Sequence, residues 1–86
     1  MNFKLSSHAQ EEMRRRNIPP ALLDSVLHHP QQIVPAVGGR KAYQSQLDFG
    51  GGKIFLLRAI VADEVDPAMV VTVYRTSKIS KYWRTI

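Results

Sequence analysis

The stretch of this sequence best suited to chemistry is Thr72–Lys78, which gathers hydroxyl, phenol, guanidinium and ammonium groups. We expect it to run from the end of a strand into the start of a helix, where free backbone N–H groups add to its capacity to bind an anion. Tyr74 contributes a ring on which a nucleic-acid base can stack and a hydroxyl that can donate a proton. An ordinary solvated strand end is the alternative interpretation.

His8 is the candidate general base, because it falls in the first turn of an expected helix. The positive end of the helix dipole disfavours the imidazolium form, which keeps the ring neutral near pH 7. A histidine that only caps or packs the start of the helix is the alternative. His28 and His29 are neighbours on a helix and point about 100° apart, so they do not converge on one metal ion. We therefore expect neither a metal nor a cofactor.

Arg58 interrupts an otherwise apolar strand over residues 54–62. An unpaired buried guanidinium is very costly, so its side chain must meet water, a carboxylate or a ligand phosphate. A structural ion pair and a functional phosphate contact both remain open at this point. Arg40, Arg75 and Lys78 are further cations suited to holding a phosphate, and arginine binds two of its oxygens at once.

Two helices are expected to precede the strands. Ser7 with Gln10 forms a capping box, which predicts a first helix over about residues 8–16. The proline pair at 19–20 starts a second helix with one apolar stripe, and Pro30 ends it.

From Ile33 onward the apolar period changes to two, which predicts strands over 40–49, 54–62 and 69–75 after a short extended piece at 33–34. In the last strand, alternation places Met69, Val71 and Val73 on one face. A short helix is expected over 79–84. The predicted fold is α+β, with two N-terminal helices packed on a twisted antiparallel sheet of three to four strands and a short C-terminal helix.

The composition indicates a small basic domain. The 86 residues carry 12 Lys plus Arg against 7 Asp plus Glu, a net charge of +5, and no cysteine. We expect a single domain over 1–86 without a disulfide or a cysteine nucleophile. No apolar run reaches the ~20 residues of a membrane span, and the start lacks the apolar core of a secretory signal, so we expect a cytoplasmic protein without a membrane partner. The excess charge favours a polyanionic partner such as nucleic acid.

The run His8–Ile18 resembles the first-helix pattern of a family of small bacterial proteins known only as a domain of unknown function. That pattern is His-Ala, then Arg-Met, then Arg-Gly-Ile. Glu12 stands where the family usually has arginine, and Asn17 where it has glycine, although asparagine also tolerates a left-handed turn. Further matches are Val26–Pro30, Gly39–Tyr43 and Val70–Lys78.

This family is similar to BrnT and RelE toxins, which implies helices on a twisted antiparallel sheet and metal-independent endoribonuclease activity. The implied partners are RNA and an antitoxin protein, and the free protein is expected to be a monomer or homodimer. In this chemistry the ribose 2′-hydroxyl attacks its own phosphate, which requires a base, an acid and cations. The expected catalytic residues are His8, Arg40, Arg58, Tyr74 and Lys78. The expected RNA-binding residues are Arg16, Lys41, Tyr43, Arg75, Thr76, Ser77 and Lys81.

A second hypothesis is a non-catalytic module that binds nucleic acid or a partner protein through the basic end at 75–84. It predicts salt-dependent binding without cleavage and no effect of replacing His8. Glu12 in place of a cation favours this hypothesis, whereas the resemblance favours the endoribonuclease.

Overall fold

The protein, described here by a computed structural model over residues 2–85, is built on a five-stranded mixed sheet. Its strand order is β1-β5-β4-β3-β2, with β1 parallel to β5 and every other pair antiparallel. The strands are β1 (Phe3–Leu5), β2 (Gln32–Pro35), β3 (Lys41–Asp48), β4 (Ile54–Ala62) and β5 (Ala68–Thr76). The α+β class is confirmed, but the prediction of three to four antiparallel strands is wrong. Three residues are too few for β1 to show an alternating pattern in the sequence.

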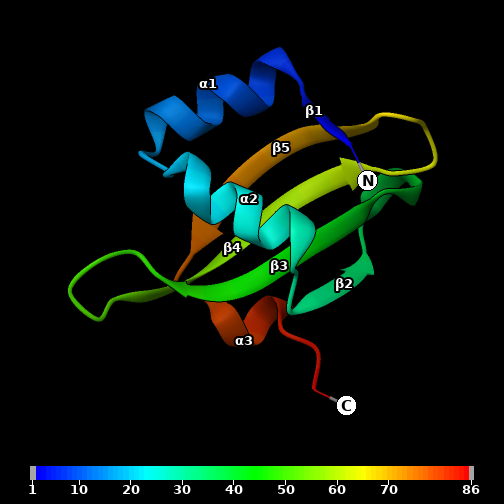
Figure 1. The fold of residues 1–86 in the computed structure, drawn as a ribbon. Helices are drawn as coiled ribbons and strands as arrows, with labels where there is room; N and C mark the ends of the chain where they lie inside the picture. The colour runs from blue at the N-terminus through cyan, green and yellow to red at the C-terminus, as the bar shows by residue number, and fades with distance from the viewer. Residues whose placement is uncertain (1, 86) are drawn as a thin grey trace.

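The two longer helices cover one face of the sheet, and the short last helix lies on the other (Figure 1). Helix α1 (Ser7–Arg15) packs along β5, while α2 (Pro20–His28) packs over β3 and β4. Helix α3 (Ile79–Tyr82) follows β5 on the opposite side. No helix within residues 2–85 is long and apolar enough to span a membrane.

Ser6, rather than Ser7, is the N-cap of α1. The backbone of Ser6 is extended, and its hydroxyl oxygen accepts the Ala9 N–H at 3.0 Å. The same hydroxyl donates to the carbonyl oxygen of Val71 at 2.9 Å, which ties the start of the helix to β5. The predicted capping box at Ser7 is therefore wrong by one residue, because this long-range bond to β5 selects between two adjacent serines. Asn17 does adopt the left-handed conformation, with a φ of 53°.

The hydrophobic core lies between the sheet and the helices α1 and α2. It is formed by one face of the strands and the apolar stripe of α2, and includes Leu23, Val26, Leu27, Tyr43, Leu57, Ala59, Val61 and Val73. Because successive strand residues point to opposite faces, Gln44 and Arg58 lie on the face away from these helices.

A β-bulge in β5 changes which side chains face the core. Ile60 pairs with Thr72 but its neighbour Val61 pairs with Val70, so Val71 is the extra residue. Val70 and Val73 are consequently both fully buried. The predicted face of Met69, Val71 and Val73 is therefore wrong, because one inserted residue shifts the alternation of the first part of the strand.

Candidate functional site

Arg58 is almost completely buried on the face of the sheet opposite α1 and α2, with an exposed fraction of 8%. Its Nε donates to Oε1 of Gln44 at 2.9 Å, and its Nη1 donates to the hydroxyl of Tyr74. The guanidinium carbon lies 4.3 Å from the ring centre of Tyr82 and 5.7 Å from that of Tyr74. The two tyrosine rings are themselves in edge contact, with centroids 6.3 Å apart. Arg58 is therefore fixed in position by an amide, a phenol and an aromatic face.

Within residues 2–85, Arg58 forms no ion pair with a carboxylate. Its hydrogen-bond and ring contacts within residues 2–85 are with neutral groups, which orient the guanidinium without cancelling its charge. The sequence left open a structural ion pair and a phosphate contact for Arg58. The described residues do not form the ion pair. The arrangement leaves a desolvated positive charge that favours an anion, since electrostatic attraction is stronger where water is excluded.

Gln44 sets the orientation of this arginine. Its side chain is fully buried, and its Nε2 donates to Oε1 of Gln32 at 2.8 Å and to the carbonyl oxygen of Tyr82 at 3.2 Å. With both amide hydrogens used, its oxygen is turned towards Arg58. Gln44 was not predicted, because nothing local in the sequence marks a glutamine as buried.

Arg58 lines a hollow of about 710 Å³ on this face, which we call the tyrosine–arginine hollow. Three of the predicted catalytic residues, Arg40, Arg58 and Tyr74, meet there. The complete lining is Pro35, Ala36, Val37, Gly38, Arg40, Arg58, Ile60, Tyr74 and Tyr82. The residues of the hollow come from the end of β2, the β2–β3 connection, β4, β5 and α3.

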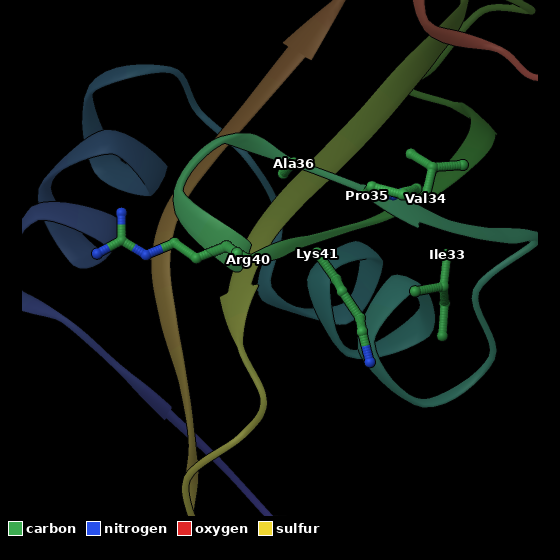
Figure 2. A pocket seen from close by; sticks show the side chains of 7 residues that line it. Ile33, Val34, Pro35, Ala36, Arg40 and Lys41 are labelled. Atoms are coloured by element: carbon green, nitrogen blue, oxygen red, sulfur yellow. The ribbon is translucent and has the colours of Figure 1, made fainter.

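The connection between β2 and β3 decides where Arg40 and Lys41 point. A short 3-10 turn over Val37–Gly39 contains Gly38 at a φ of 76°, and the Ala36 N–H donates to the Arg40 carbonyl oxygen at 2.8 Å. Figure 2 shows the side chains of Arg40 and Lys41 leaving this turn in different directions, beside an adjoining hollow of about 500 Å³. Arg40 lines both hollows, whereas Lys41 lines only the adjoining one.

Lys41 and Tyr43 both contact Asp63, on the face of the sheet that carries α1 and α2. The Lys41 ammonium is 3.3 Å from Oδ2 of Asp63, and the Tyr43 hydroxyl donates to the same oxygen at 2.9 Å. Burial, together with the Asp63 carboxylate, raises the pKa of Tyr43 to about 12. Tyr43 is only 5% exposed and belongs to the core, so it lies outside the tyrosine–arginine hollow.

Tyr82 is the aromatic residue that was missing from the predicted site. The Lys81 ammonium, with smaller contributions from Tyr74 and Arg58, lowers the pKa of Tyr82 despite some opposing desolvation. The Lys81 nitrogen lies 5.2 Å from the ring centre of Tyr82, which places Lys81 beside the hollow without lining it. The alternation of cations and aromatic residues over 74–84 is the signal in the sequence from which Tyr82 could have been predicted.

The remaining predicted residues divide into two groups. A further hollow of about 520 Å³, on the side of the sheet that carries α1, is lined by Arg16, Arg75, Thr76 and Ser77, and we call it the helix-side hollow. His8 and Lys78 line neither the helix-side hollow nor the tyrosine–arginine hollow. His8 is exposed in the first turn of α1, and Lys78 is exposed at the start of α3. The structure therefore does not bring His8 next to Arg58.

Residues 5–75 match the family described as a domain of unknown function, DUF4258, and the chain belongs to that family. This confirms the resemblance to a family of unknown function. No curated protein and no solved structure matches the chain. The further likeness to BrnT and RelE toxins stays a prediction.

Proposed function

We propose that this domain binds single-stranded RNA in the tyrosine–arginine hollow and cleaves it without a metal ion, as the toxin of a toxin–antitoxin pair with a RelE- or BrnT-like fold. The observation that carries the proposal is Arg58, a buried guanidinium with a phenol, an amide and a tyrosine ring around it but no acidic partner among the described residues. A phosphate supplies the missing negative charge, and the tyrosine rings supply a stacking surface for a base.

The size and the lining of the hollow suit a nucleotide unit. Its volume of about 710 Å³ is within the ~300–1,000 Å³ of ordinary ligand sites. Arg58 is buried and Arg40 exposed on the lining of this hollow, so a phosphate bound there would meet two guanidinium groups. A small inorganic anion would leave the rings of Tyr74 and Tyr82 unused, and this favours RNA over phosphate alone.

The proposed reaction is an internal displacement at phosphorus. The 2′-oxygen forms a bond to phosphorus as its proton passes to a base, and the bond to the 5′-oxygen breaks as that oxygen receives a proton. Arg58 and Arg40 stabilise the charge that develops on the phosphorane. Because His8 lines neither hollow, we assign proton transfer to Tyr82, with its lowered pKa, and to Tyr74.

The second candidate function is a non-catalytic RNA-binding or partner-binding module. One observation favours it: the lining of the tyrosine–arginine hollow includes neither a histidine nor a carboxylate that would act as an efficient base near pH 7. In the toxin hypothesis an antitoxin covers the hollow, and Val37, which is 93% exposed on its lining, is an apolar contact for such a protein.

The decisive experiment incubates the purified protein with a labelled unstructured RNA in EDTA. Cleavage by the wild type, with loss in Arg58→Met and Tyr82→Phe, supports the endoribonuclease. Lys4→Gln is the control, because Lys4 is exposed on β1 and lines neither hollow.

The two candidate functions give different results in this experiment. RNA binding that needs Arg58, without cleavage, supports the module and overturns the enzyme. A folded wild-type protein that neither binds nor cleaves RNA overturns the endoribonuclease and the RNA-binding module, and leaves only the partner-binding form of the second candidate.

A further inference from the structure

The helix-side hollow concentrates positive charge where α1 ends beside the start of β4 and the end of β5. Its lining consists of Arg15, Arg16, Asn17, Phe55, Arg75, Thr76 and Ser77. Three guanidinium groups and two hydroxyls therefore surround one space of about 520 Å³. These are the donors that arginine-rich and hydroxyl-containing sites use for phosphate.

One buried carboxylate organises two of the three arginines. Glu12 is only 7% exposed; its Oε2 accepts from Nε of Arg15 at 2.8 Å and its Oε1 accepts from Nε of Arg16 at 3.4 Å. Its hydrogen bond with Arg15, opposed by desolvation, lowers the pKa of Glu12. The Glu12 carboxylate thus orients two guanidinium groups, and the cluster of Glu12, Arg15 and Arg16 keeps a net positive charge.

The third arginine is held by aromatic rings instead of an acid. The guanidinium carbon of Arg75 lies 4.8 Å from the ring centre of Phe49 and 4.9 Å from that of Phe55. Within the described residues, Arg75 forms no ion pair. As at Arg58, aromatic rings lie against a guanidinium that has no acidic partner among the described residues, although Arg75 is less buried.

The two hollows lie on either side of one strand end. Tyr74 lines the tyrosine–arginine hollow and the next residue, Arg75, lines the helix-side hollow, because neighbouring strand residues point to opposite faces. Strand β1 pairs with β5 through Ala68–Val70, and no further strand pairing covers the outer edge of β5 beyond that point within residues 2–85. A flexible polyanion can therefore pass from one hollow to the other over this edge.

We propose that the helix-side hollow is a second phosphate site for the same RNA strand, which crosses the end of β5 and is held on both faces of the sheet. This inference rests on the proposed RNA binding in the first hollow. Arg16 and Arg75 contact the second phosphate, the hydroxyls of Thr76 and Ser77 complete its hydrogen bonds, and Glu12 is a positioning residue.

The test compares variants that remove one positive charge each from the same protein. The probe is a fluorescein-labelled uridine dodecamer with 2′-O-methyl groups, which lacks the nucleophilic 2′-hydroxyl and so stays intact, and fluorescence anisotropy measures its Kd at several salt concentrations. Arg16→Gln and Arg75→Gln are each expected to weaken binding about ten-fold and to reduce the salt slope by about 0.7, the value for one contact with a single strand. Arg14→Gln is the matched control, because Arg14 is on the same helix and pairs with Glu11 outside this hollow.

The outcomes separate this inference from the function on which it rests. If Arg58→Met abolishes dodecamer binding but Arg16→Gln and Arg75→Gln behave like Arg14→Gln, RNA binding stands and the second site is overturned. If the wild type fails to bind the dodecamer, both fall. Arg16→Gln keeps the test valid should Arg75→Gln unfold, since the Arg16 side chain is 41% exposed.

Discussion

At the scale of single residues, the unusual feature of this protein is a buried arginine whose partners in the described part of the chain are neutral groups. Gln44 and Tyr74 accept from the Arg58 guanidinium, and Tyr82 covers its face. A carboxylate in the same place would stabilise the arginine but would cancel the field that attracts a ligand anion. Neutral acceptors keep the group in one orientation and leave its charge for a ligand.

Replacement of Arg58 by methionine is expected to weaken RNA binding by at least about ten-fold, because a buried charge–phosphate contact is lost. The free energy of unfolding should fall by only about 1–2 kcal/mol, since methionine fills the volume while Gln44 and Tyr74 each lose one partner. Anisotropy with labelled RNA and urea denaturation measure the two effects. Unchanged RNA affinity combined with a large loss of stability would assign Arg58 a structural role instead.

Tyr43 predicts a pH dependence of stability at high pH. Its pKa is raised to about 12 in the folded protein, whereas an unfolded tyrosine ionises near ~10. Between these values the unfolded state releases a proton that the folded state retains, so stability falls as the pH rises. The loss approaches roughly 2–3 kcal/mol at the upper end. Urea denaturation between pH 9 and about 12 should show this slope for the wild type relative to Tyr43→Phe; equal slopes would contradict it.

At the scale of elements, the start of α1 is fixed by one serine that bonds in two directions. Ser6 accepts from the Ala9 N–H and donates to the Val71 carbonyl oxygen, so it joins the helix to β5 as well as capping it. Ser7 is already inside the helix and exposed.

Ser6→Ala is therefore expected to destabilise the protein by about 1–2 kcal/mol, because it removes both the N-cap bond and the bond to β5. Ser7→Ala should change stability by less than about 0.5 kcal/mol, as a surface substitution inside a helix. Thermal or urea denaturation of the two variants gives the comparison. A larger effect at Ser7 would place the cap where the capping-box pattern predicted it.

Local signals in the sequence located most elements correctly. The first helix was expected over 8–16 and is Ser7–Arg15, and the strand 54–62 is β4 with the same bounds. Prolines, glycines and alternating apolar residues act over a few neighbours, so they are visible without tertiary structure. Strand β1 was missed and the faces of β5 were assigned wrongly. Pairing of three residues with a distant strand, and a one-residue bulge, leave no local pattern.

At the scale of the whole molecule, negative and positive charges are separated at opposite ends of β5. The acidic loop with Asp63, Glu64 and Asp66 precedes this strand, and the cations of the helix-side hollow surround its other end. At ~3.3 Å per residue, Ala68 and Arg75 are roughly 20 Å or more apart. That separation exceeds the ~8–10 Å Debye length at physiological salt, so the acidic loop does not neutralise the basic end.

Glu64→Gln is accordingly expected to change RNA affinity by less than about two-fold at physiological salt, because its charge is screened from the cations of the helix-side hollow at the other end of β5. Anisotropy with the uridine dodecamer measures this, with Arg16→Gln as the comparison expected to show a large effect. An increase in affinity as large as the decrease caused by Arg16→Gln would mean that RNA also passes over the acidic loop.

The sequence by itself determined the α+β class, most helix and strand bounds and the family membership, because these depend on short-range patterns and on motifs in a fixed order. It also identified Arg58 as a residue that needs an explanation. Only the tertiary structure decided that Arg58 meets Arg40, Tyr74 and Tyr82 on one face, that four other predicted residues share a second hollow, and that His8 joins neither. These groupings depend on strand register, the bulge and the side on which α3 folds back, and each of them is set by contacts between residues far apart in the chain.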